Sequence, residues 1–178
     1  MIIELFKKES RKIMDFIFAL GYFSEIIMIF IVIYVLHSNL FYTFYYLFFV
    51  LLSGYLNTIL KSIIKEDRPD NYKKFLYSEH FSKIKQVYGM PSGHSQNIFF
   101  SITYLFLTTK EFIYWIQLLL VLAALMFYER LSFHNHTFLQ LFVGAIIGIV
   151  LAYLVVLLRD QIEINIMDPI NQINPHSS

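Results

Sequence analysis

The chain has 178 residues, the size of one domain, and 57% of them are hydrophobic, with a mean hydropathy of +0.58. This is more apolar than ordinary soluble proteins. A net charge of only +1 gives no sign of a nucleic-acid partner, and the lack of cysteine excludes disulfides and thiolate metal sites. The apolar residues gather in runs close to the roughly 20 that a helix needs to cross a bilayer, so we expect an integral membrane protein.

Five apolar runs predict an all-α, polytopic transmembrane helix bundle that forms a single domain over residues 1–178. In chain order the expected spans are Ile13–Leu36, Leu40–Ile64, His94–Thr109, Phe112–Tyr128 and His136–Leu158. The third span is the shortest, so we expect one of its ends to lie recessed in the headgroup zone. Residues 161–178 read as a polar C-terminal tail, and no cleaved signal peptide is expected in front of the first span.

The only long connection, Lys65–Met90, joins the second and third spans. Its apolar residues could form one side of an interfacial helix that lies flat on the membrane. They are Tyr72, Phe75, Leu76, Phe81, Ile84 and Val87.

Successive spans must alternate in direction, so the topology brings three distant segments to one membrane surface. These segments are Lys61–Pro69, Pro91–His94 and Arg130–His136. Their convergence is the basis of the functional prediction.

The first of these segments supplies two cations. Lys61 and Arg68 are seven residues apart, about two helical turns, so we expect both on one side of the second helix, which Pro69 then ends. Two cations on one face can bind phosphate, although cationic side chains at a helix end often only extend towards the headgroups.

The second segment is Pro91-Ser92-Gly93-His94, directly before the third span. Ser92 is expected near an N-cap position, where free backbone N–H groups favour anion binding. Gly93 allows close approach of the backbone, and His94 could give a proton to a leaving oxygen. The same residues are also an ordinary helix start.

The third segment contains Arg130, His134 and His136, with Gln140 four residues further on. If the carbonyl of Gln140 accepts from Nδ1–H of His136, then Nε2 is unprotonated and can attack phosphorus. His134 competes for this role. A His-x-His pair can also indicate a metal, but no further ligand group stands at the required spacing.

The three segments fit K-x6-R-P, P-S-G-H and R-x5-H in order, and together they resemble the type 2 phosphatidic acid phosphatase family over roughly residues 53–153. The resemblance implies a metal-independent lipid phosphatase without a cofactor, in which His136 attacks, a phosphohistidine forms and His94 protonates the leaving group. It also implies a group of phosphate-binding residues: Lys61, Arg68, Ser92, Gly93 and Arg130. The family bundle usually has six membrane helices, against the five counted above.

Two positions depart from the family pattern, because Glu129 replaces a serine and Gln140 replaces an aspartate. A glutamine can orient an imidazole but cannot stabilise its positive charge as a carboxylate does. The run Tyr88–Gln96 and the glutamine at position 140 are similar to the dolichyl diphosphatase branch, whose substrate carries a better leaving group than an alkoxide. The expected substrate is therefore a polyprenyl diphosphate. Phosphatidate or another lipid monophosphate, and a non-catalytic phospholipid-binding protein, are the alternatives.

Other features leave more than one interpretation open. Glu25 lies midway through the first span, and it is either a functional group or a protonated or hydrogen-bonded packing residue. Gly144 and Gly148 predict close helix packing, without implying a dimer. Basic residues concentrate on the face of the three segments, which favours a cytoplasmic site. The dolichyl diphosphatase resemblance implies a lumenal site in the endoplasmic reticulum instead.

Overall fold

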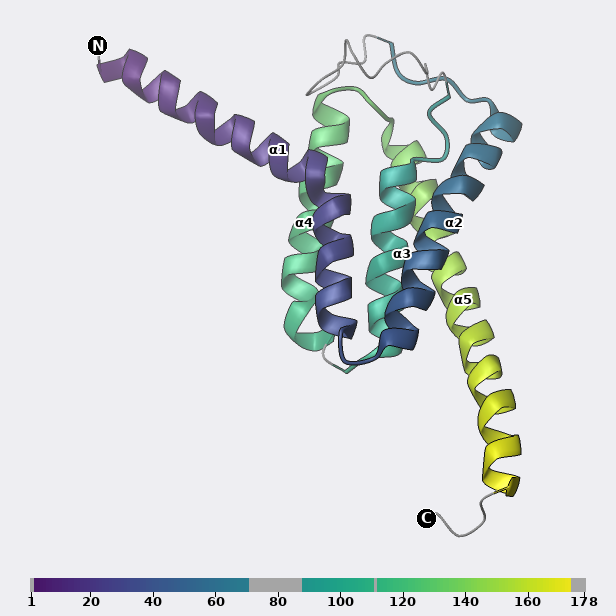
Figure 1. Cartoon of the computed structure of the whole chain (residues 1–178). Helices are drawn as coiled ribbons and strands as arrows, with labels where there is room; N and C mark the ends of the chain where they lie inside the picture. Colours follow the sequence, from purple (N-terminus) through teal and green to yellow (C-terminus); the bar gives the residue numbers. More distant parts are fainter. Residues whose placement is uncertain (1, 71–87, 111, 174–178) are drawn as a thin grey trace.

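The computed structural model describes residues 2–70, 88–110 and 112–173, and the side chains of 8–70, 88–110 and 112–165. This part of the chain folds into five helices, shown in Figure 1. They are α1 (Ile2–Leu36), α2 (Leu40–Ile64), α3 (Gly93–Thr108), α4 (Phe112–Ser132) and α5 (Phe138–Ile173). The expected all-α membrane bundle is confirmed, whereas the interfacial helix expected between α2 and α3 lies outside the described residues.

Four of these helices are long and apolar enough to cross a bilayer, with segments Lys8–Leu36, Leu40–Ile64, Phe112–Ser132 and Phe138–Asn165. The exception, α3, has 16 residues and is therefore about 24 Å long, against a hydrocarbon core of about 30 Å. This short helix lies at the centre of the bundle and contacts all four other helices, which surround it. The bundle is thus built around its shortest and most polar helix.

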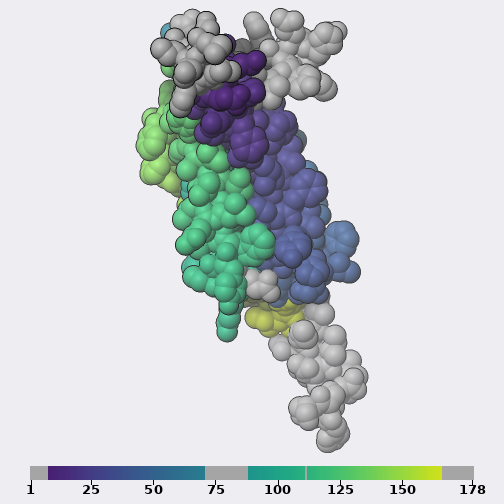
Figure 2. Space-filling view, turned by 90° about the vertical axis from the view of Figure 1, so that its left-hand side faces the viewer, coloured from purple at the N-terminus to yellow at the C-terminus, as the bar shows by residue number. Residues whose placement is uncertain are grey.

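The outer surface of the bundle is apolar, as a lipid-facing surface must be. Large hydrophobic side chains project outward from α1 and α4, which lie side by side in Figure 2, among them Phe16, Phe30, Ile113 and Tyr114. The interior holds a second apolar set that includes Met28, Tyr46, Phe100, Tyr104 and Met126.

The closest helix contact, between α3 and α5, depends on two glycines of α5. A Cβ at Gly144 would stand 2.5 Å from the carbonyl oxygen of Ser92, and a Cβ at Gly148 would overlap the carbonyl of Gln96. The hydroxyl of Ser95 donates to the carbonyl of Leu141 across the same contact, at 2.7 Å. The expected close packing is confirmed, and it lies within the chain.

In α2 and α5, three helix ends differ from expectation. The second helix ends at Ile64, where Lys65 adopts a left-handed conformation (φ 53°), and not at Pro69. The fifth helix begins at Phe138, so His136 belongs to the connection before it. The same helix continues to Ile173, so most of the expected polar tail is helical.

Polar contacts hold this extension of α5 against the bundle. Arg159 donates to the hydroxyl of Thr108 at 2.8 Å, and its guanidinium lies 4.3 Å from the centre of the Tyr42 ring. The hydroxyl of Tyr42 in turn donates to Glu163 at 3.1 Å. These contacts explain why the helix does not end where its apolar run ends.

The close contact of α3 and α5 predicts a measurable loss of stability when Gly148 is replaced by alanine. The added methyl would meet a main-chain carbonyl that cannot move aside, and overpacking of this kind costs about 1–3 kcal/mol. We expect a lower melting temperature in detergent. The control is Gly54→Ala, because a Cβ at Gly54 has its nearest neighbour at 3.8 Å and alanine favours a helix. Equal melting temperatures for the two variants would contradict this account.

Candidate active site

The three segments that the topology was expected to bring together do meet, at the end of the bundle where α2 and α4 end and α3 and α5 begin. They surround a pocket of about 190 Å³. This is below the roughly 300–1,000 Å³ of sites that enclose a drug-sized ligand. The pocket is therefore large enough for a small polar group but not for a whole lipid.

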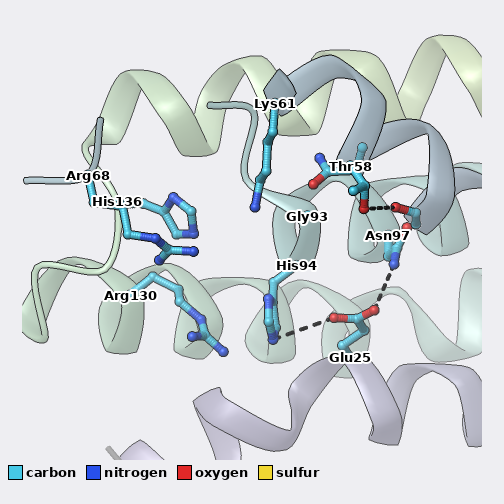
Figure 3. Close-up of a pocket in the computed structure, with 11 residues that line it drawn as sticks. Glu25, Thr58, Lys61, Arg68, Gly93, His94, Asn97, Arg130 and His136 are labelled. Carbon is cyan, nitrogen blue, oxygen red and sulfur yellow. Dashed lines mark hydrogen bonds and ion pairs between the residues drawn. The ribbon is translucent and has the colours of Figure 1, made fainter. Parts of the chain in front are cut away.

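Three cationic side chains line the pocket, from different parts of the chain (Figure 3). Lys61 lies in the last turn of α2. Arg68 was expected on the same helix, but it lies beyond the helix end and donates to the carbonyl of Asn135 at 3.0 Å. The connection after α2 therefore brings Arg68 to the pocket, and the contact with Asn135 fixes it to the connection before α5.

Arg130, the third cation, lies near the end of α4 and is buried. Its Nε is 3.0 Å from a carboxylate oxygen of the fully buried Glu129, and its guanidinium lies 5.4 Å from the centre of the Tyr22 ring. Glu129, one of the two departures from the family pattern, thus provides a counter-charge for Arg130 inside the bundle.

The Pro91–His94 segment contributes Gly93 and His94 to the lining, whereas Ser92 does not reach the pocket. Ser92 is the N-cap residue of α3, as expected. It is fully buried, and its N–H donates to the carbonyl of Gln140. A Cβ at Gly93 would stand 3.0 Å from Oδ1 of Asn57, so glycine allows the start of α3 to pack directly against α2.

A buried polar network holds this segment in place. The amide of Asn57 donates to the carbonyl of Pro91 at 3.2 Å and to Oε1 of Gln96 at 2.9 Å. The amide of Gln96 donates to the carbonyl of Ser53 at 2.8 Å, and the hydroxyl of Ser53 donates to Oδ1 of Asn97 at 2.8 Å. Buried and fully paired groups of this kind are rigid, so α2 and α3 present the pocket as one unit.

His94 has a carboxylate partner from α1. Its Nε2 lies 3.6 Å from Oε2 of Glu25, and the other oxygen of Glu25 accepts from the amide of Asn97 at 2.7 Å. Glu25 also lines the pocket (Figure 3). The interpretation of Glu25 as a hydrogen-bonded packing residue is therefore confirmed. The functional interpretation stays a prediction, for a residue that faces the pocket.

His136 lines the pocket, whereas the competing His134 is exposed and does not. The Nδ1 of His136 lies 3.2 Å from Oε1 of Gln140, the expected pairing across one turn. Burial first, and then the charges of Arg68, Lys61 and Arg130, lower the pKa of His136 to about 3, although the hydrogen bond with Gln140 opposes the shift. The imidazole is therefore neutral at physiological pH and its free nitrogen can act as a nucleophile.

The predicted site residues thus fall into two groups. The pocket brings together Lys61, Arg68, Gly93, His94, Arg130 and His136, whereas Ser92 and Gln140 lie behind it. Sequence reasoning did not single out Asn57, Asn97 or Glu66, all of which contact a predicted site residue or its helix. A polar residue inside an apolar run was a usable signal for the two asparagines; Glu66 gave none.

The fold and the pocket define a membrane protein with a cation-lined pocket at one end of a helix bundle, and the comparisons with known proteins identify its family. The sequence model of the PAP2 superfamily matches residues 42–163. The chain therefore belongs to this superfamily. The match includes the three segments, all of α3 and α4, and most of α2 and α5; α1, which supplies Glu25, lies outside it.

Among curated proteins, the chain is similar to Dolichyldiphosphatase 1 of Dictyostelium discoideum, with 37% identity over 101 residues. The aligned part is 51% of this chain and 41% of that protein, so the chain covers about two fifths of the length of this relative. No solved structure gives a significant match.

The lowered pKa of His136 predicts how stability depends on pH. The imidazole has an ordinary pKa of 6.5 and a folded-state pKa of about 3, so between these values the unfolded chain binds a proton that the folded chain does not. Stability therefore falls as the pH drops below 6.5, by roughly 2 kcal/mol between pH 6.5 and pH 5. We expect His136→Gln to lose less of its melting temperature than the wild type over this range.

The control for this experiment is His134→Asn, which removes an exposed histidine and tolerates the left-handed backbone found at this position (φ 52°). It should follow the wild type. An equal loss of melting temperature in the His136→Gln variant would show that His136 is protonated in the folded protein.

Proposed function

We propose that the chain is a metal-independent lipid phosphatase that hydrolyses a polyprenyl diphosphate to the monophosphate through a phosphohistidine intermediate. The observation that carries the proposal is the pocket itself. A neutral His136, a second histidine and three cations face one small cavity at the end of a membrane bundle. Membership of the PAP2 superfamily supports the same class of reaction.

In the first step, the lone pair on Nε2 of His136 attacks the terminal phosphorus. The bond from phosphorus to the bridging oxygen breaks, and its electron pair leaves with the lipid monophosphate, which takes a proton from His94. In the second step, water attacks the phosphohistidine and gives a proton to His94. The N–P bond breaks, its electron pair returns to Nε2, and orthophosphate leaves.

The positive charges of Lys61, Arg68 and Arg130 stabilise the negative charge on the transferring phosphoryl group. They are held in place before substrate binds, Arg68 by the carbonyl of Asn135 and Arg130 by Glu129. Burial and the neighbouring cations lower the pKa of His94. The carboxylate of Glu25, 3.6 Å from Nε2 of His94, acts in the opposite direction and can attract a proton to that ring when the phosphate is bound. These groups supply the electrostatic stabilisation that a metal ion would otherwise provide.

Two observations favour a diphosphate over a monophosphate. His136 is paired with the neutral Gln140 and not directly with a carboxylate, so the site suits a leaving group that needs less assistance. The named activity of the Dictyostelium relative is hydrolysis of dolichyl diphosphate. If the substrate is of this type, the expected membrane is that of the endoplasmic reticulum.

The experiment is a phosphate-release assay on purified protein in detergent with a metal chelator present. We expect release from a polyprenyl diphosphate, and a loss of at least about 1,000-fold in His136→Ala, because the nucleophile is removed. The His134→Asn variant should keep wild-type turnover. Rapid quenching with a terminally labelled substrate should trap label on the wild-type protein and none on His136→Ala.

The same assay separates the alternatives. Faster turnover of phosphatidate than of the diphosphate would assign the chain to lipid monophosphates. Lipid binding with no phosphate release at any pH would mean a non-catalytic phospholipid-binding protein. Normal turnover by His136→Ala would reject the phosphohistidine mechanism.

A further inference from the structure

The partner of His136 is itself held by a carboxylate that lies on another part of the chain. Gln140 donates from Nε2 to Oε1 of Glu66 at 2.8 Å, while its Oε1 lies 3.2 Å from Nδ1 of His136. The three side chains thus form a line from a carboxylate, through an amide, to an imidazole. Glu66 follows α2 in the connection that carries Arg68.

The orientation of the Gln140 amide is fixed by groups other than His136. Its Nε2 lies 2.8 Å from the carboxylate of Glu66 and 2.8 Å from the carbonyl of Asp67. A carbonyl oxygen and an ionised carboxylate can both only accept hydrogen bonds, so the nitrogen of the amide must face them. On the other side, the N–H of Thr137 donates to Oε1 of Gln140 at 3.2 Å. The oxygen of the amide must therefore face His136, and Nδ1 of His136 must carry the proton.

The surrounding backbone leaves the amide no room to turn or to meet water. Gln140 is fully buried, and a Cβ at Gly89 would stand 2.5 Å from its Oε1. The N–H of Gly89 donates to the carbonyl of Glu66 at 2.7 Å, and a β-bridge pairs Asp67 with Tyr88. The two ends of the long connection therefore enclose the Gln140 side chain. In such a dry site, a nearby charge acts strongly on a hydrogen-bonded chain.

We propose that Glu66 is a positioning residue for the reaction, which acts on His136 through the Gln140 amide and supplies the negative charge that position 140 lacks. The proposal rests on the proposed function. As Nε2 gives its lone pair to phosphorus, positive charge grows on the imidazole. The carboxylate polarises the amide, so that its oxygen stabilises this charge at Nδ1–H. No proton is transferred along the line, because Gln140 has no acidic group.

The first test is Glu66→Gln, which keeps the shape of the side chain and removes its charge. A charge-assisted hydrogen bond is roughly twice as strong as a neutral one, so kcat should fall about 10-fold. KM should change by less than about 3-fold, because Glu66 does not line the pocket. The matched control is Asp70→Asn, an exposed carboxylate four residues away in the same connection, which should leave kcat unchanged.

A double-mutant cycle tests whether Glu66 acts through Gln140. If it does, Gln140→Ala alone lowers kcat by more than Glu66→Gln, and adding Glu66→Gln to Gln140→Ala causes no further loss. A general structural role for Glu66 would instead multiply the two losses. Melting temperatures of all variants, measured in the same detergent, show whether each remains folded.

A second readout does not depend on turnover. With ¹⁵N-labelled histidine, the spectrum of the wild type should show His136 protonated on Nδ1, and His136→Gln identifies the signals. Protonation on Nε2, wild-type kcat in Glu66→Gln, or multiplicative losses in the cycle would each overturn the inference. An inactive wild type on every lipid phosphate would refute the proposed function instead, and these two failures are distinct.

Discussion

The distance between two helices, α3 and α5, sets the geometry of the candidate site. α3 carries His94 at its start, and α5 carries Gln140, the partner of His136, in its first turn. Gly144 and Gly148 allow the two backbones to approach so closely that a single methyl group would push them apart. Because the N–H of Ser92 also donates to the carbonyl of Gln140, any change in this distance would move His94 and His136 relative to each other.

The positions of the cations are also fixed by the fold, because charges inside a bundle must be paired or held by hydrogen bonds. Arg130 is balanced by Glu129, and Arg68 is held by the backbone of Asn135. The acidic residues are distributed in the same manner, with Glu25 beside His94 and Glu66 behind Gln140. Each of the two histidines of the pocket is therefore associated with one carboxylate. The contact is direct for His94 and passes through the Gln140 amide for His136.

The sequence was sufficient to predict the helical membrane fold and the shared surface of the three segments, because these follow from hydropathy and the alternation of spans. The pairing of His136 with Gln140 was also predicted, although His136 lies just before α5 and not within a helix. The apolar span was expected to end at Ile64, but the helix itself was expected to continue to Pro69. The sequence could not predict that the helix stops at Ile64, since the left-handed conformation of Lys65 has no signal in a lysine. The continuation of α5 was missed because Arg159 and Glu163 are held by side chains of other helices. Glu66 was missed for a similar reason, since its contact spans 74 residues of sequence.

The central position of α3 has a consequence for how the protein reaches its native state in the membrane. This helix is short, and it carries His94, Gln96 and Asn97, whose polar groups are satisfied by α1 and α2. Exposed to lipid without those partners, these groups would cost several kcal/mol. Stable integration of α3 is thus coupled to the helices around it. During biogenesis, α3 should enter the membrane together with these helices and not independently of them.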